Sequence, residues 1–434
     1  MYPALSAKAA TLLKLRTLPL QRARRCTNAL TAWNHLIISN LIEAAPSRMS
    51  TPHFHALSVK RIEPLTAQAA AITFAISPDL RDTFKFLPGQ FITLRAMVDG
   101  QAVRRSYSLC STPAQLASAQ EITVGIKRVE GGVFSTWATT VLCVGDEVDV
   151  MPPDGRFTPK AALGAPHTGV QGNIQVNIQA NSQGAHRLGL AAGSGITPIL
   201  SIMAHTLASD ASSRFTLVYG NQRTGTIMFH EALQDLKDRY AHRVSLVHVL
   251  SRQPQEVDLL QGRLDEAKVT ALLEQLVPAA QIAEVFICGP EAMIESAERA
   301  LAKAGVAPGR VHAERFATGN QFTTKTIAAR ACSTAPNADN AYEFALEVIL
   351  DGKGHSFGMH AGDNVLDTAL AGNLDLPYAC KAGVCCTCRA KVLEGKVTME
   401  KNFTLEQWEI DKGFVLTCQA HCASGRVVVS YDER

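Results

Sequence analysis

Short hydrophobic runs separated by Pro and Gly turns dominate the chain between residues 53 and 158. Five of these runs are rich in β-branched residues: 57–62, 71–76, 90–94, 122–126 and 147–150. Regularly spaced short strands with little helix between them are typical of an antiparallel β-barrel. The pattern therefore predicts a barrel domain over residues 53–158 that ends at a turn-forming Pro-Pro-Asp-Gly sequence.

The hydrophobic pattern changes after residue 187, where buried strands alternate with helical segments. The predicted strands are 188–192, 215–219, 244–250 and 285–288, and the predicted helices begin at Pro198, near His230 and at Glu291. Strands that alternate with helices of ten or more residues form parallel sheets with helices on both faces. We therefore predict a doubly wound α/β domain over residues 187–316.

The last part of the chain, residues 342–434, has the pattern of a small β-rich domain. A strand hairpin is predicted around Asp351-Gly352, followed by a helix near 364–370, a cysteine-rich loop and two closing strands. This order predicts a β-grasp domain. Two segments without such patterning, 159–186 and 317–341, are predicted to be an inserted linker and a second linker.

Composition adds bounds to this three-domain prediction. The chain has 434 residues with 47% hydrophobic and 19% charged residues, as in ordinary globular proteins. A net charge of +3 gives no reason to expect a nucleic-acid partner, and no apolar run approaches the ~18 residues of a membrane span. Of the eleven cysteines, several lie singly in apolar runs, so we expect reduced thiols and a cytoplasmic protein.

The first 48 residues differ from the rest, with seven Lys or Arg residues against the single acid Glu43. Such a segment resembles an organellar transit peptide. The simpler interpretation is a start codon placed too far upstream, because a strand-like segment follows Met49 at once. We expect residues 1–48 to be disordered or to precede the true start, and to lie outside the fold.

Four cysteines have the spacing C-x4-C-x2-C with a distant fourth, which is the ligand pattern of a plant-type [2Fe–2S] cluster. The predicted iron ligands are Cys380, Cys385, Cys388 and Cys418. A zinc site would need a second C-x2-C pair or histidines, and neither is present. Only Cys385 gives both spacings at once, so Cys386 is interpreted as a bystander. Cys422 is a weaker alternative to Cys418.

A second candidate site lies where a predicted strand meets a helix. The glycines of Gly193-Ser-Gly195 allow a tight turn and a close approach of backbone to a pyrophosphate, with Thr197 expected to cap the helix and Pro198 in its first turn. Helix N-termini of this kind bind phosphate. The run Cys288-Gly289-Pro290 ends a later strand, and the carboxyl ends of parallel strands meet at one edge. These features predict a nucleotide site.

The barrel carries a third candidate site. Arg105, Tyr107 and Ser108 could together neutralise a phosphate, cover a flat ring and hydrogen-bond its edge. The run 131–136 offers backbone amides for a pyrophosphate. The alternative interpretations are a packed tyrosine and a plain turn followed by a helix cap.

The order of these three units resembles the ferredoxin–NADP reductase superfamily with a fused C-terminal plant-type ferredoxin. The resemblance covers the chain from about residue 53 to its end. More narrowly, five segments are similar to the reductase subunits of phenylacetyl-CoA 1,2-epoxidases: 54–60, 192–198, 376–381, 396–400 and 414–419. The insertion at 163–185, Cys386 and the N-terminal tail depart from that family.

The resemblance implies roles for residues in all three sites. It implies FAD contacts from Arg105, Tyr107, Ser108, Lys127, Gly132, Val133, Ser135, Thr136 and Phe316. It implies nicotinamide nucleotide contacts from Gly193, Gly195, Thr197, Pro198, Ser251, Arg252, Cys288, Gly289 and Pro290. The implied catalytic set is Tyr107, Ser108, Cys288 and Glu314.

The implied activity is electron transfer from NADPH through FAD and the [2Fe–2S] cluster to a separate di-iron oxygenase that epoxidises phenylacetyl-CoA. Ser251 and Arg252 follow a strand end that lacks an acid, which favours a 2′-phosphate and hence NADPH. The oxygenase is expected to dock around the loop 377–388, near Lys381, Arg389 and Lys391. A reductase of another aromatic-ring oxygenase would share every motif, and a redox sensor without enzymatic activity is a more distant alternative.

Overall fold

The computed structural model describes residues 53–160, 184–316 and 342–433. The predicted N-terminal extension 1–48, most of the predicted linker 159–186 and the predicted linker 317–341 lie outside the described residues. Within the described ranges, no helix combines the length and apolar character that crossing a membrane requires.

The first part is a six-stranded antiparallel sheet in the order β4-β3-β6-β1-β2-β5. Its strands are β1 (His55–Thr66), β2 (Ala69–Ala75), β3 (Phe91–Val98), β4 (Gln101–Ser108), β5 (Glu121–Lys127) and β6 (Glu147–Val150). The two edge strands meet where Leu109 bridges Val124 and the Cys110 amide donates to Thr123 O at 2.9 Å. This contact brings the edges together as in a barrel.

Two helices accompany the barrel, α2 (Pro113–Ala119) and α3 (Val133–Thr140). Helix α3 buries Phe134 and Ala138 against core residues of the strands such as Phe74 and Ile92, each at most 1% exposed. Burial of this apolar face fixes α3, and with it the Gly131-Gly132 turn that leads into the helix.

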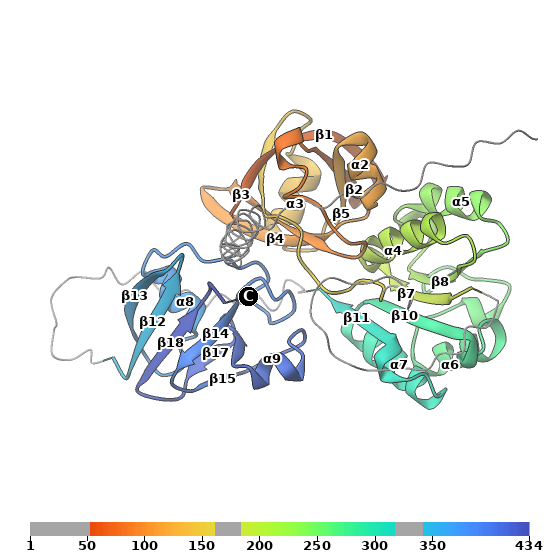
Figure 1. Cartoon of the computed structure of the whole chain (residues 1–434). Helices are drawn as coiled ribbons and strands as arrows, with labels where there is room; N and C mark the ends of the chain where they lie inside the picture. The colour runs from red at the N-terminus through yellow and green to blue at the C-terminus, as the bar shows by residue number, and fades with distance from the viewer. Residues whose placement is uncertain (1–52, 161–183, 317–341, 434) are drawn as a thin grey trace, which may run out of the picture. The chain divides into compact units, whose positions relative to one another are not determined.

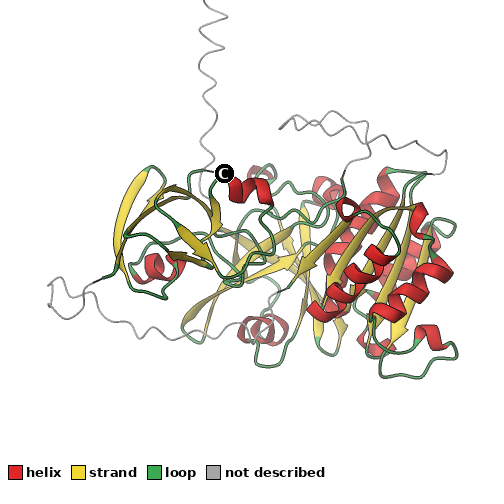
Figure 2. Ribbon diagram, turned by 90° about the horizontal axis from the view of Figure 1, so that it is seen from below, coloured by secondary structure: helices red, strands yellow, loops and turns green. Residues whose placement is uncertain are grey.

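The second part is a five-stranded parallel sheet in the order β11-β10-β7-β8-β9. Its strands are β7 (His186–Ala192), β8 (Arg214–Asn221), β9 (Val244–Leu250), β10 (Ile282–Gly289) and β11 (Val311–Arg315). Helices α4 (Ile196–Ser209), α5 (His230–Arg239), α6 (Glu266–Leu276) and α7 (Glu291–Lys303) complete it. Figure 2 shows the helices beside the parallel strands.

The helices of this part cover both faces of the sheet. Ile199 of α4 and Leu233 of α5 belong to one buried cluster, whereas Leu272 of α6 and Ile294 of α7 belong to another. Figure 1 shows α4 and α5 on one side of the strands and α6 and α7 on the other. The predicted doubly wound sheet is confirmed, although α6 and β11 were not among the predicted elements.

The third part is a mixed sheet in the order β13-β12-β18-β14-β16, with β12 and β18 parallel. Its strands are β12 (Phe344–Leu350), β13 (Lys353–Met359), β14 (Arg389–Glu394), β16 (Phe414–Leu416) and β18 (Arg426–Ser430). Strands β15 (Val397–Met399) and β17 (Ala420–Cys422) form a separate pair, and the helices are α8 (Val365–Ala371) and α9 (Gln407–Asp411).

Local sequence explains two features of this third part. Asp351 and Gly352 both have positive φ, 51° and 74°, as a two-residue hairpin turn requires, so the predicted hairpin is confirmed. Asn364 Oδ1 accepts from the Asp367 amide at 2.8 Å and caps α8. The predicted fold class is confirmed, and we propose 53–158, 187–316 and 342–434 as the domain boundaries.

Candidate functional site

The cysteine loop lies between α8 and β14, and its fourth cysteine follows β16. Cys380, Cys385, Cys388 and Cys418 are 7%, 6%, 2% and 6% exposed. Hydrogen bonds from the thiols of Cys385 and then Cys418 lower the pKa of Cys380 well below its usual value. Cys418 is in turn next to Cys388. Thus the structure brings the four predicted iron ligands into one buried group.

Several donors point at these sulfurs. The Ala382 amide donates to Cys380 Sγ at 3.3 Å, and Gln419 Nε2 donates to Cys418 Sγ at 3.6 Å. Gly383 has φ of +76°, and a Cβ there would lie 3.0 Å from Lys401 O. Buried thiols that receive N–H donors fit an iron–sulfur cluster. Among the described residues, no three His, Cys, Asp or Glu side chains converge to hold a metal ion as placed, so the assignment rests on spacing, burial and donors.

The two other nearby cysteines lie apart from this group. Cys386 has φ of +57° and neighbours Thr404 and Arg156, and burial raises the pKa of its thiol to about 11. Cys422 lies on β17, and its Sγ is 3.3 Å from Met359 Sδ. The placement agrees with the prediction that neither residue is an iron ligand, and we keep Cys418 as the proposed fourth ligand.

Most of the predicted flavin residues lie on β4 and at the start of α3, whereas Lys127 ends β5 and Phe316 follows β11. The Tyr107 ring centroid is 5.7 Å from that of Phe134, and burial lowers the pKa of the Arg105 guanidinium. A desolvated cation is stabilised by a phosphate placed beside it. The Arg105 environment therefore fits the diphosphate of FAD.

The turn before α3 is shaped for close contact with such a group. Gly131 has φ of +71°, and a Cβ on Gly132 would lie 2.5 Å from Ser135 Oγ. Ser135 Oγ accepts from the Val129 amide at 3.2 Å and so fixes the turn. A cavity of about 480 Å³ opens here, lined by Gln68, Arg128, Val129, Glu130, Gly131 and Thr136. Val133 is an exposed neighbour at the start of the helix.

The glycine turn between β7 and α4 is held tightly against β10. A Cβ on Gly195 would lie 2.0 Å from Cys288 O, so only glycine fits. Tyr219, which is fully buried on β8, donates its hydroxyl proton to Gly193 O at 2.7 Å. Lys127 Nζ of the barrel would lie 3.6 Å from a Cβ on Gly193. The turn and the N-terminus of α4 therefore lie next to a cation of the barrel, Lys127.

The expected capping role of Thr197 is wrong. Helix α4 begins at Ile196 with Gly195 as its N-cap, and no side chain caps it. Thr197 lies in the first turn and donates from Oγ1 to Ser194 O at 3.0 Å. Pro198 lies in the first turn as predicted. Because Thr197 does not cap the helix, its side chain accepts no hydrogen bond from the amides of this turn. Those amides can then donate to a phosphate.

Three of the predicted catalytic residues meet at the junction of the barrel and the parallel sheet. Ser108 Oγ donates to Glu314 Oε2 at 2.9 Å, and Glu314 pairs with Cys288 in the β10–β11 register. Burial raises the pKa of Glu314 to about 8, against a lowering by the Ser108 hydrogen bond. Burial raises the pKa of Cys288 as well. Tyr107 is the neighbour of Ser108 on β4.

The remaining predicted nucleotide residues lie at the carboxyl edge of the sheet. The Ser251 and Arg252 amides donate to Asn221 O and Gln222 O, each at 2.9 Å, so they sit beside the end of β8. Gly289 and Pro290 lead from β10 into α7, and Phe316 follows β11. Sequence reasoning missed the exposed Arg223 at the same edge; its position just after a buried strand is the signal that could have found it.

Family models match each of the three parts. They are the oxidoreductase FAD-binding domain over residues 56–158, the oxidoreductase NAD-binding domain over 190–299, and the 2Fe-2S iron-sulfur cluster binding domain over 348–423. The matches agree with the three sites built from the residues. The chain is therefore an oxidoreductase with places for FAD, a nicotinamide nucleotide and a [2Fe–2S] cluster.

Whole-chain relatives share this arrangement. A 1,2-phenylacetyl-CoA epoxidase subunit from Escherichia coli K12 is 40% identical over 88% of this chain and 98% of its own. The ferredoxin reductase component of 3-ketosteroid-9-alpha-monooxygenase from Rhodococcus rhodochrous is 33% identical over 86% and 96%. An intact type IV self-sufficient cytochrome P450 monooxygenase shares the fold, with a TM-score of 0.56 and 20% identity over 87% of this chain and 41% of that one. The chain thus belongs to the ferredoxin–NADP reductase superfamily with a fused [2Fe–2S] domain, in the family of oxygenase reductase components that includes this 1,2-phenylacetyl-CoA epoxidase protein.

Proposed function

We propose that this reductase carries electrons from NADPH, through FAD and the [2Fe–2S] cluster, to the di-iron oxygenase of a phenylacetyl-CoA epoxidase. The 40% identity to a component of such an epoxidase over nearly the whole chain supports this partner. Bound FAD supplies the chemistry that connects a two-electron hydride donor to one-electron acceptors.

The contact between Ser108 and Glu314 is the observation that carries the proposal. It joins a barrel strand to the last strand of the parallel sheet at 2.9 Å, with Cys288 fully buried beside it. The barrel holds the proposed FAD residues and the sheet holds the proposed nucleotide residues, so the two ring systems would meet at this junction. With its pKa at about 8, the Glu314 carboxyl is protonated at neutral pH and can hold a proton next to the reacting rings.

A preference for NADPH is proposed from the charge at the ends of β8 and β9. Ser251, Arg252 and Arg223 lie at the two strand ends, where the adenosine ribose binds in such sheets. No acid follows β9 before Glu256 to accept a ribose 2′-hydroxyl. A guanidinium and a hydroxyl instead suit a 2′-phosphate.

The nucleotide preference is tested with Arg252→Ala. We expect the KM for NADPH to rise tenfold or more, while the KM for NADH changes less than twofold. Arg239→Ala, which changes an exposed arginine in the last turn of α5, serves as the matched control. Equal effects of Arg252→Ala on both coenzymes would contradict the proposal.

The partner is tested by reconstitution. Purified protein with FAD and cluster is combined with NADPH, phenylacetyl-CoA and the oxygenase subunits of a phenylacetyl-CoA epoxidase, and the epoxide is measured. We expect turnover that depends on both proteins. If only a different aromatic-ring oxygenase accepts the electrons, the protein is the reductase of that system; if NADPH reduces neither ferricyanide nor cytochrome c, a redox sensor becomes the better interpretation. The cytoplasmic location remains a prediction.

A further inference from the structure

The cluster loop, defined here as residues 376–390, is buried or half-buried along its whole length. Its cover includes Phe91 at the start of β3, which is 7% exposed. Phe91 packs in one apolar group with Ala379, Cys380, Ala382 and Cys385. A barrel side chain therefore belongs to the apolar group that contains two of the four proposed iron ligands.

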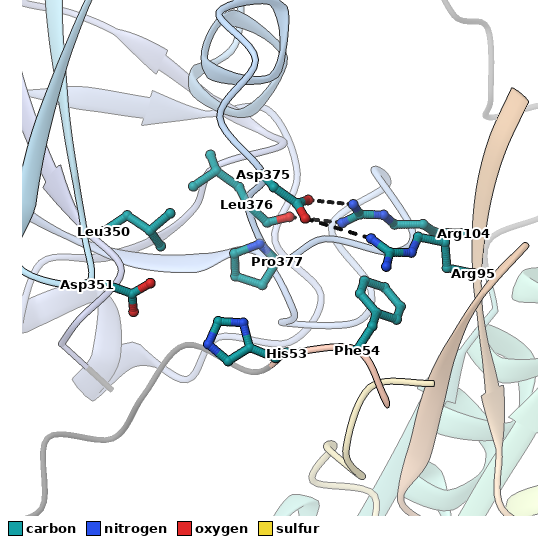
Figure 3. Close-up of a pocket in the computed structure, with 9 residues that line it drawn as sticks. All are labelled: His53, Phe54, Arg95, Arg104, Leu350, Asp351, Asp375, Leu376 and Pro377. Carbon is teal, nitrogen blue, oxygen red and sulfur yellow. Dashed lines mark hydrogen bonds and ion pairs between the residues drawn. The ribbon is translucent and has the colours of Figure 1, made fainter. Parts of the chain in front are cut away.

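Arg104 of β4 contacts the segment at the start of this loop and is only 8% exposed. It donates from Nη1 to Leu376 O at 3.0 Å and from Nη2 to Asp375 Oδ1 at 2.6 Å. Its guanidinium carbon lies 4.4 Å from the Tyr378 ring centroid. Figure 3 shows Arg104 and Arg95 pointing at Asp375 beside a cavity of about 240 Å³.

A second arginine of the barrel part, Arg156, follows the last barrel strand. Its Nη2 donates to Glu409 Oε1 at 2.7 Å, and Glu409 also accepts from Arg389. The Glu409 side chain is completely buried. Burial alone would raise its pKa, but the bond from Arg156 and the other donors lower the pKa to about 2. The carboxylate is thus held ionised between an arginine of each part.

We propose that Arg104 and Arg156 are positioning residues that hold the cluster loop against the flavin barrel for the internal electron step. Apolar packing together with ion pairs is typical of a specific protein interface. The Arg104 guanidinium and the Glu409 carboxylate are the buried members of the two pairs. A shift of the loop would leave these buried charges without a partner, so each pair favours the docked arrangement. The inference rests on the proposed function and names residues that would act in it.

With both cofactors bound, the step would be a one-electron transfer in which the reduced flavin is oxidised and one ferric iron of the cluster is reduced to ferrous. No bond forms or breaks between the two centres, and no proton moves between them. The arginines would therefore set distance and orientation only, and their loss should change the rate of this step without changing the hydride step before it.

The test uses the full chain with both cofactors bound and the variants Arg104→Ala and Arg156→Ala. Hydrogen exchange of amides 376–390 reports docking without any turnover. We expect exchange in this segment to become at least fivefold faster. Stopped-flow absorbance should show flavin reduction by NADPH within twofold of the parent and cluster reduction at least tenfold slower. Cluster absorbance and ferricyanide reduction should stay unchanged.

Two further variants make the test specific. Arg299→Ala removes an exposed arginine that pairs with Glu266 on the parallel-sheet part, and should change none of these readouts. Arg104→Asp combined with Asp375→Arg reverses the pair, and we expect exchange protection and cluster reduction to recover in part. Recovery should be incomplete because Arg95 remains beside position 375 and would repel a cation there.

The remaining outcomes would contradict either the positioning role or the proposed function. Unchanged exchange and unchanged cluster reduction in both alanine variants would overturn the positioning role. Loss of cluster absorbance in a variant would assign that arginine to folding of the loop and also overturn its role. Failure of NADPH to reduce flavin in the parent protein would instead refute the proposed function, while the exchange data would still report docking.

Discussion

Glu314 depends for its behaviour on residues far away in the sequence. Its carboxylate accepts from Ser108, on a strand 206 positions earlier, and its backbone pairs with that of Cys288. Desolvation in this junction keeps the carboxyl protonated to about pH 8. A lone glutamate in a short strand gives no sign of this until the two sheets meet.

The raised pKa predicts a change of stability with pH. The folded protein holds a proton on Glu314 up to about pH 8, whereas an unfolded glutamate releases it near pH 4.3. The stability that this group contributes is therefore present below about pH 4.3 and is lost as the pH rises to 8. In Glu314→Gln we expect the Tm of the cofactor-free protein to fall less than that of the parent between pH 5 and pH 8, by several degrees.

Calorimetry of the two proteins across this range checks the prediction. Glu274→Gln, which changes an exposed glutamate of α6, is the control and should follow the parent curve. Parallel curves for Glu314→Gln and the parent would show that the carboxyl ionises normally.

The cysteines give a second prediction at the residue scale. Replacing Cys380, Cys385, Cys388 or Cys418 by Ser should abolish the visible cluster absorption, because each removes one of four thiolate ligands. NADPH-driven reduction of the flavin should persist. Cys386→Ser is the matched control, since its thiol lies beside Thr404 and Arg156 instead of in the group of four. Bleaching by Cys386→Ser alone would mean that the ligand assignment is mistaken.

At the scale of elements, the connection from β7 to α4 is tightly constrained by its neighbours. Gly195 is the N-cap of α4 and packs against the carbonyl of Cys288 at the end of β10. The Tyr219 hydroxyl donates to the carbonyl of Gly193 and holds the turn in place. The helix N-terminus is therefore positioned by two other strands of the sheet. Its amides are aimed by packing, without a side-chain cap.

Gly195→Ala should damage this element. The added Cβ would lie 2.0 Å from Cys288 O, so either α4 or β10 must shift. We expect a loss of about 1–3 kcal/mol in the free energy of unfolding of this part and a KM for NADPH raised at least tenfold. Gly225→Ala, where nothing lies within 4 Å of the new Cβ, is the control and should change neither quantity. Wild-type nucleotide binding in Gly195→Ala would show that the turn does not hold the phosphate.

For the molecule as a whole, electrons must leave through the part that holds the cluster. The cations expected to meet the oxygenase are already engaged in the structure: Lys381 pairs with Asp367 at 2.6 Å, Lys391 with Glu433 at 3.3 Å, and Arg389 with the buried Glu409. Both lysines are about one-third exposed and can still face a partner. Arg389 is better explained by its internal contact.

The docking prediction is therefore restricted to the two lysines. Lys381→Gln combined with Lys391→Gln should slow NADPH-dependent turnover of the oxygenase about three- to tenfold at low salt and weaken its salt dependence. Ferricyanide reduction should stay the same. Lys353→Gln, an exposed lysine on β13, is the control. A parallel fall of both activities would assign the lysines to the stability of the cluster domain.

Much of the architecture followed from local pattern. β-branched runs and turns predicted the barrel, strand–helix alternation predicted the parallel sheet, and Asp351-Gly352 predicted a hairpin, because these features act over a few residues. The cysteine spacing is equally local, and it predicts the four iron ligands. Helix α6 was missed although Asp265 caps it, and β11 was missed because its five half-buried residues show no alternation.

The tertiary structure alone decided how the sites are completed. It placed Glu314 beside Ser108, Tyr219 under Gly193, and Glu409 between Arg156 and Arg389. Each contact joins residues that lie on separate elements, where only packing determines distance. Spacing in the sequence determines which side chains share a loop or a strand. Desolvation and ion pairing arise only when those elements pack against one another, and they set the pKa values and the docking of the cluster loop.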